Sequence, residues 1–107
     1  DILGYHYNDE QTANCIKEIY QEHHYLVCPH TAVGCLAMKD FLKSHPEPSN
    51  AIVLATAHPV KFGEVVEPII NQQIEIPERL KSILVNDKKS ISMNKDFSMF
   101  KEWLLNK

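Results

Sequence analysis

The sequence predicts an α/β fold that is rich in helices and has few strands. Several segments repeat apolar side chains at helical spacing, whereas residues 51–55 form an apolar run without alternation. A run of this kind is typical of a strand covered on both faces. The length of 107 residues leaves room for one modest hydrophobic core. We therefore expect a single domain over residues 1–107.

The first helix is expected to begin at Asn8 or Asp9, since either is a good N-cap and an acidic first turn follows. It should end near His23 and His24. Its apolar stripe follows helical spacing and consists of Ile16, Ile19, Tyr20 and His23.

A second helix is expected to begin near His30 or Thr31, because Pro29 biases Cys28 away from helical dihedral angles. It should end before residues 44–50, which are rich in proline and capping residues. The face expected to be buried consists of Val33, Leu36, Ala37 and Phe41.

The second half of the chain is expected to contain three more helices. Pro59 fits the first turn of one helix, Pro77 precedes another over 78–85, and the last runs to the terminus. Residues 89–93 alternate and indicate a short edge strand. The apolar stripes of the first and last of these helices are Phe62, Val65, Val66, Ile69 and Ile70, then Phe97, Phe100 and Leu104.

The strand expected at 51–55 needs neighbouring strands that this chain barely supplies. The first residue is Asp rather than Met. On these two grounds we expect the chain to be a piece of a longer protein.

Composition and charge exclude two classes of protein. The net charge is −3 with acids and bases interspersed, so a basic surface for nucleic acid is not expected. No apolar run approaches the ~18 residues of a membrane span. Three cysteines, Cys15, Cys28 and Cys35, form no disulfide-framework spacing. Their odd number indicates a reducing compartment, and we expect a cytoplasmic protein.

Metal and thiol chemistry are not favoured by the sequence. The six histidines are scattered, and neither C-x-x-C nor H-E-x-x-H occurs. We therefore expect no metal site. Cys28 and Cys35 are better interpreted as small buried hydrophobic residues. A Cys28–His30 pair is the alternative, although no third residue orients it.

Thr56, His58 and Lys61 follow the apolar run directly. If 51–55 is a parallel strand, they lie at its carboxyl end, where open α/β sheets bind ligands. Free amides of the next helical turn favour an anion there, and Lys61 strengthens that preference. In the alternative interpretation, Thr56 is an ordinary loop hydroxyl, His58 is a helix cap and Lys61 is a solvated side chain. In the helix that begins near His30, the small residue Gly34 permits close approach of the backbone to a neighbour or ligand. The alternative is an ordinary capped helix with small packing residues.

The two segments together resemble a known family. "PHTAVG" at 29–34 and "VLATAHPVKF" at 53–62 closely resemble the carboxyl-terminal signatures of the threonine synthase family. The resemblance extends to P-E-R-L at 77–80, the short strand and the terminal helix, so it covers essentially the whole chain. The chain departs from the family at Cys28, where an acidic residue commonly precedes the proline.

This resemblance implies a pyridoxal-phosphate enzyme of the tryptophan-synthase-like fold. Such an enzyme is a phosphate-eliminating carbon–oxygen lyase that converts O-phosphohomoserine and water into threonine and phosphate. The family's Schiff-base lysine and glycine-rich phosphate cradle belong to earlier sequence, and Lys61 lies outside the lysine motif. The resemblance therefore implies that this chain is inactive alone and that its partner is the amino-terminal portion of the same enzyme.

The resemblance also assigns roles to site residues. Thr56, with Ala55 as its rival, is expected to face the ring nitrogen of pyridoxal phosphate, where a neutral hydroxyl keeps the ring a weaker electron sink. His58 and Lys61 are expected to help neutralise the substrate phosphate. The alternative function is a stand-alone binding or interaction domain. Unpaired strand edges would also promote self-association of the isolated chain.

Overall fold

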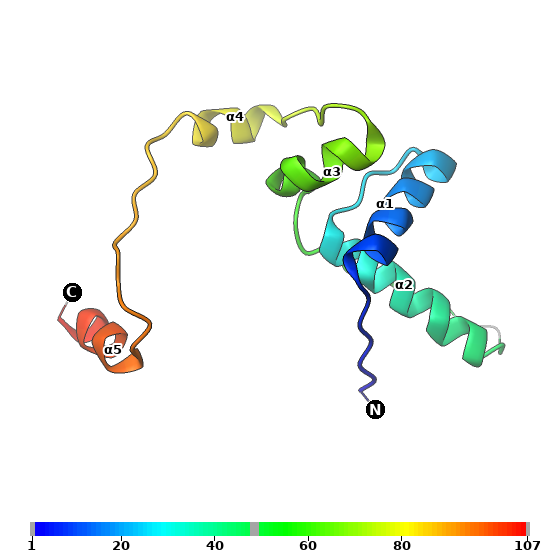
Figure 1. Cartoon of the computed structure of the whole chain (residues 1–107), viewed down its shortest axis with the longest axis horizontal. Coiled ribbons are helices and arrows are strands. Elements are labelled where there is room, and N and C mark those ends of the chain that lie inside the picture. The colour runs from blue at the N-terminus through cyan, green and yellow to red at the C-terminus, as the bar shows by residue number, and fades with distance from the viewer. Residues whose placement is uncertain (1, 48–49, 107) are drawn as a thin grey trace. The chain divides into compact units, whose positions relative to one another are not determined.

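The computed structural model describes residues 2–47 and 50–106 as a set of helices (Figure 1). They are α1 (Asp9–His23), α2 (Pro29–Ser44), the 3₁₀ helix η1 (Pro59–Phe62), α3 (Gly63–Ile70), α4 (Glu78–Leu84) and α5 (Phe97–Leu105). The chain divides into a first unit ending at Ile76 and a second unit beginning at Pro77. One domain over residues 1–107 stays a prediction.

Helix α1 has the ends that the sequence predicts. The Asn8 side chain accepts a hydrogen bond from the Gln11 amide at 2.8 Å, and the Gln11 side chain accepts one from the Asn8 amide at 3.0 Å. This capping box satisfies two amides that lack acceptors within the helix. At the other end, His24 adopts a left-handed conformation with φ 49° and donates to the Tyr20 carbonyl.

Helix α2 begins at Pro29, one residue before the predicted start, and Cys28 is its extended N-cap. Proline suits this position because its fixed φ is helical and its missing N–H would have no helical acceptor. The helix ends at Ser44, one residue later than predicted. Residues 48 and 49 of the loop predicted at 44–50 lie outside the described residues.

The predicted buried face of α2 is partly wrong. Thr31 and Ala32 are its buried residues, whereas Val33, Leu36, Ala37 and Phe41 are only partly buried. The start of α2 contributes Ala32 to the core cluster, and of the predicted residues Leu36 packs against that cluster while partly buried. Further along the helix, Phe41 stacks instead on His45, with ring centroids 4.0 Å apart.

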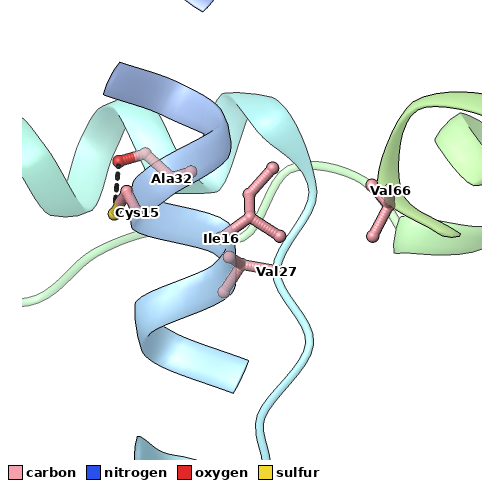
Figure 2. Close-up of a cluster of buried hydrophobic side chains, with 5 residues drawn as sticks. All are labelled: Cys15, Ile16, Val27, Ala32 and Val66. Carbon is pink, nitrogen blue, oxygen red and sulfur yellow. Dashed lines mark hydrogen bonds between the residues drawn. The ribbon is translucent and has the colours of Figure 1, made fainter. Parts of the chain in front are cut away.

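The core of the first unit is small and lies between α1, α2 and α3. It consists of Cys15, Ile16, Val27, Ala32 and Val66 (Figure 2). The Cys15 thiol donates to the Ala32 carbonyl at 3.6 Å, which joins α1 to α2 within the core. Outside the core, the Lys39 ammonium pairs with the Glu18 carboxylate at 2.9 Å and joins the same two helices.

The two expected strands do not form within the described residues, although the helix-rich character of the fold is confirmed. Residues 51–55 and 89–93 have no regular secondary structure. Ile52 is 87% and Leu54 77% exposed. A strand is stabilised by hydrogen bonds to a neighbouring strand, and none of the described residues forms one. The apolar run is therefore extended sequence without a sheet.

The helix predicted after Pro59 is divided into η1 and α3. The His58 ring accepts from the Val60 amide at 3.2 Å and caps η1, and α3 then begins at Gly63. Val66 is the buried residue of α3, and Asn71 ends this helix in a left-handed conformation with φ 53°. This arrangement fixes the geometry of residues 58–62.

The second unit contains α4 and α5, at almost the predicted positions. Helix α4 ends one residue before the predicted Val85, and α5 begins after Asp96, whose side chain accepts from the Ser98 amide at 2.7 Å. Residue 107 of the predicted last helix lies outside the described residues. Neither helix contains a buried residue. The stripe of Phe97, Phe100 and Leu104 is exposed.

Among the helices that the structure describes, none combines the length and the hydropathy needed to cross a membrane.

Candidate functional site

The two motifs, 29–34 and 53–62, pack against each other in the first unit. The ring of His30 packs on the ring of Phe62, and Gly34 faces the side chain of Val53. Segments distant in sequence therefore meet, as expected for a composite site.

Gly34 explains how closely the two segments approach. A Cβ atom at this position would lie 3.1 Å from Cγ1 of Val53, closer than most real contacts. Glycine removes that clash, since it has no side chain. The interpretation of Gly34 as a residue of close approach is confirmed, and the neighbour is Val53.

Cys28 lies at the junction of the two motifs and is 1% exposed. Its Sγ is 3.3 Å from the Thr31 hydroxyl oxygen. Burial by itself raises the pKa of the Cys28 thiol, but the donors around it, led by the Thr31 hydroxyl, outweigh it, and the net pKa is lowered. The Cys28 side chain makes no cap hydrogen bond to the first turn of α2.

The alternative of a Cys28–His30 pair gains no support from the His30 ring, which packs on Phe62 with centroids 5.1 Å apart and a 57° angle between the planes. This ring contact links the two motifs alongside the contact of Gly34 with Val53. The sequence signal for the environment of Cys28 was its place just before the Pro29 helix start, because helix amides stabilise a thiolate.

Thr56 and Ala55 lie in the loop beside α2. Thr56 is exposed, and its hydroxyl makes no hydrogen bond within the part of the chain that the structure describes. Ala55 lines a cavity of about 280 Å³ together with Tyr25 and Thr31. Ala55 thus lines this hollow, whereas Thr56 is not among its lining residues and offers an exposed hydroxyl.

His58 lines a different cavity, of about 530 Å³, together with His24, Tyr25 and Glu75. Its Nδ1 accepts from the Val60 amide at 3.2 Å. The neutral ring therefore carries its proton on Nε2. That proton is the one His58 has available to donate to a ligand.

Lys61 does not line the cavity that contains His58. Its ammonium lies 6.0 Å from the centroid of the Phe62 ring, and the lysine is exposed. The structure thus brings Ala55 and His58 to two different hollows, leaves Thr56 exposed outside both, and places the Lys61 ammonium over an aromatic ring. Tyr25 lines both hollows, a feature that its sequence position did not reveal.

Among residues 2–47 and 50–106, no three histidine, cysteine or acidic side chains come together as a metal site.

Comparison with known proteins identifies the family. The family described as "Threonine synthase, C-terminal" matches residues 31–104, which include most of the first motif and all of the second. The chain belongs to the threonine synthase family. Its resemblance to that family, inferred from the two motifs, is confirmed.

Similarity to individual threonine synthases supports the same assignment to the family. The chain is 36% identical to threonine synthase of Haemophilus influenzae over 98 residues, which cover 92% of the chain and 22% of that relative. It is 37% identical to threonine synthase of Pseudomonas aeruginosa over 83 residues, or 77% of the chain and 17% of the relative. The chain therefore spans about a fifth of the length of these relatives.

A solved threonine synthase has the same fold in this region. The crystal structure of threonine synthase from Escherichia coli superimposes with a TM-score of 0.71 and 30% sequence identity. The match covers 91% of this chain and 22% of that chain. The helix-rich arrangement is therefore that of one part of a threonine synthase, and a stand-alone binding domain is not favoured.

Proposed function

We propose that this chain serves as the carboxyl-terminal part of a threonine synthase, a lyase that converts O-phosphohomoserine and water into threonine and phosphate. The observation that carries the proposal is the packing of motif 29–34 against motif 53–62, through the contacts of Gly34 with Val53 and of His30 with Phe62. Membership of the family and the likeness to a solved threonine synthase support it.

The exposed hydroxyl of Thr56 fits the cofactor that such an enzyme uses. Pyridoxal phosphate, when bound, supplies an electron sink for the amino-acid substrate. The Thr56 hydroxyl has no hydrogen-bond partner within the described residues and is free to donate to an unprotonated ring nitrogen. A neutral donor leaves that sink weaker than a carboxylate partner would. Ala55, the rival position, has no side-chain donor.

His58 and Lys61 are proposed to act on the substrate phosphate. His58 holds its Nδ1 on a backbone amide, so its Nε2 proton is oriented and can be donated to a phosphate oxygen. Lys61 adds positive charge close by in sequence, although its ammonium is over Phe62 in this structure. Hydrogen bonds to a charged oxygen are stronger than those to a neutral one. We propose His58 as the more specific contributor, because its ring is held in one orientation by the Val60 amide.

The remaining catalytic groups are proposed to lie in the amino-terminal portion of the enzyme. That portion would supply the lysine that holds the cofactor covalently and the phosphate cradle. The exposed side chains of Ile52 and Leu54 are suited to contact a neighbouring strand there. Self-association of the isolated chain stays a prediction.

A first experiment tests this division of labour. The chain alone, given pyridoxal phosphate and O-phosphohomoserine, should release no more phosphate than the cofactor by itself, because covalent catalysis needs a positioned lysine. Adding the amino-terminal portion of a threonine synthase should restore turnover. Turnover by the chain alone would contradict the proposal, and so would failure of the combined protein.

A second experiment tests Thr56 in the assembled enzyme. Thr56→Val keeps the shape but removes the donor, and should reduce kcat with little change in KM. The loss of stabilisation is about 1–3 kcal/mol, the cost of leaving a buried polar group without its partner. The absorption spectrum of the cofactor should change as well. Thr56→Ser keeps the hydroxyl and is the matched control. An unchanged spectrum and kcat in Thr56→Val would favour Ala55 as the residue at the ring.

A further inference from the structure

One residue of α3, Glu67, fixes the turn that follows this helix. Its carbonyl accepts from the Asn71 amide, where α3 ends, and from the Gln72 amide at 3.3 Å. Bonds of this kind commonly end a helix. In addition, the Glu67 carboxylate oxygen Oε1 accepts from the Ile74 amide at 3.0 Å. A single residue therefore accepts from three backbone amides of the segment after the helix.

The side-chain bond of Glu67 forms in partly buried surroundings. Ile74 packs against the core cluster while partly buried, and an amide that is shielded from water needs an acceptor. The Glu67 carboxyl also lies close to Gly63, where a Cβ atom would be 3.6 Å from Oε1. Gly63 directly follows Phe62, the last residue of the second motif. Glu67 thus joins the end of that motif to the segment around Ile74.

The segment that Glu67 fixes forms one wall of the cavity of about 530 Å³ that contains His58. The lining residues from this wall are Gln72, Gln73, Ile74 and Glu75. The wall has a second anchor in Tyr20, whose hydroxyl donates to Oε1 of Gln72 at 2.6 Å. Because this bond occupies the amide oxygen, the NH₂ group of Gln72 remains to donate. Gln72 and His58 are therefore two oriented donors that line one cavity.

We propose that Glu67 is a positioning residue which holds the wall 72–75 in place and thereby sets Gln72 as a second hydrogen-bond donor to the substrate phosphate. The role of the phosphate rests on the proposed function, which assigns it to His58. His24 and Glu75 are the other titratable residues besides the tyrosines that line this cavity. Since Glu75 is acidic, oriented donors rather than an excess of positive charge give the cavity its preference for a phosphate oxygen.

The contact of Glu67 with Ile74 is tested in the chain without any assay of activity. Amide hydrogen exchange, followed by NMR, is compared for wild type, Glu67→Met and Glu67→Gln. Methionine has a similar length but accepts poorly, so exchange of the Ile74 amide should accelerate by about tenfold or more. Glutamine keeps an oxygen of the same reach and should retain most of the protection. Unchanged exchange at Ile74 in Glu67→Met would overturn the proposal.

Glu64→Met is the matched control, because Glu64 lies on the same helix and is exposed. Its Ile74 exchange should equal that of wild type, and acceleration equal to that in Glu67→Met would overturn the proposal. Circular dichroism checks that each variant folds. If Glu67→Met does not fold, Glu67→Asp takes its place, since its carboxylate is one methylene further from Ile74. Exchange at the wild-type rate in Glu67→Asp would then overturn the proposal.

The assembled enzyme tests the consequence for substrate binding. Glu67→Met should raise KM for O-phosphohomoserine by about tenfold, the effect of losing one hydrogen bond to a charged group. Little change in kcat is expected, because a bond that forms on binding and persists in the transition state changes KM alone. Glu67→Gln and Glu64→Met should keep KM near that of wild type. An active Glu67→Met enzyme with unchanged KM would contradict the positioning role.

A double-variant cycle shows whether Glu67 acts through Gln72. Gln72→Met removes the donor and should raise KM by about the same factor as Glu67→Met. Adding Glu67→Met to Gln72→Met should then raise KM no further, since both changes remove one interaction. An additive rise would overturn the role of Gln72. If Ile74 responds as expected but the wild-type assembled enzyme makes no threonine, the proposed function fails and the contact of Glu67 with the wall stands.

Discussion

The two units of the chain differ in what stabilises their helices. In the unit ending at Ile76, α1 and α2 have 15 and 16 residues and share a buried core that includes Ile16 and Val66. In the unit beginning at Pro77, α4 and α5 have 7 and 9 residues and contain no buried residue. Isolated helices shorter than about 12–15 residues are marginal in water. The same local signals therefore have different consequences in the two units.

This difference teaches that apolar spacing predicts a helix but not its burial. The stripe of α5 has the helical period, yet Phe97 is 74% exposed. In the first unit, by contrast, Ile16 is fully buried. Burial of a large apolar side chain stabilises by about 1.5–3 kcal/mol, so only the first unit gains this term within the described residues.

The largest expected effect is a core truncation in the first unit. Ile16→Ala should destabilise the chain by about 2–5 kcal/mol, because it removes buried methyl groups and leaves a cavity. Ile83→Ala in α4 is the matched control, since Ile83 is 61% exposed and a surface change is usually within ±0.5 kcal/mol. Urea unfolding followed by circular dichroism measures both. Equal losses in the two variants would break the distinction between the units.

A smaller effect is expected where α2 meets residue 53. Gly34→Val introduces atoms where a Cβ alone would be 3.1 Å from Val53, and overpacking costs about 1–3 kcal/mol. Val53→Ala in the same chain should recover part of this loss. Unfolding free energies of the two single variants and the double variant form a cycle. A purely additive cycle would show that the two residues do not press on each other.

Removing a helix cap from each unit tests the same comparison with a smaller effect, about 1 kcal/mol in the free energy of unfolding. Asn8→Ala removes one half of the capping box of α1, and should lower the free energy of unfolding by about 0.5–2 kcal/mol. Asp96→Ala removes the equivalent cap of α5. We expect it to reduce local helicity without shifting the unfolding midpoint of the first unit. An equal shift in midpoint for both variants would show that the two units unfold together.

The smallest effect concerns a polar contact between the segment before α1 and α2. The Tyr7 hydroxyl donates to Asp40 at 2.8 Å, and this bond, followed by Lys43, lowers the pKa of Asp40. A carboxyl with a lowered folded-state pKa adds stability above its unfolded pKa and loses it as the pH falls through the folded pKa. Tyr7→Phe should therefore raise the Asp40 pKa and weaken the acid dependence of stability.

NMR titration of the Asp40 carboxyl carbon measures the change in the pKa of Asp40. Lys43→Met is the control for Lys43, the second group that lowers this pKa. The pKa of Tyr7 provides an independent test of the same hydrogen bond. Burial first, and then the Asp40 hydrogen bond, raise the pKa of Tyr7 to about 12. The stability that Tyr7 contributes to the folded chain is present below the ordinary tyrosine pKa, and it is lost as the pH rises through about 12. A Tyr7 titration at the ordinary value would contradict the contact.

The sequence by itself determined the helix ends and the family. Asn8, Pro29 and Pro77 act through their own backbone chemistry, which depends on a few neighbouring residues, and the structure confirms helix starts at or beside them. The motifs at 29–34 and 53–62 carried the resemblance to the threonine synthase family, since each is a contiguous run. Thr56, His58 and Lys61 were named as site residues on the same basis, and their roles stay predictions.

Only the tertiary structure decided which surfaces meet. Residues 51–55 were expected to form a strand, but a strand depends on hydrogen bonds to a neighbour, and none is present among the described residues. The buried side of α2 became Thr31 and Ala32 because only contact with neighbouring elements, here chiefly α1, decides which face of a helix is covered. The His30 ring packs on the ring of Phe62, 32 positions away in the sequence. Local sequence cannot specify such a contact, because packing alone brings distant groups together.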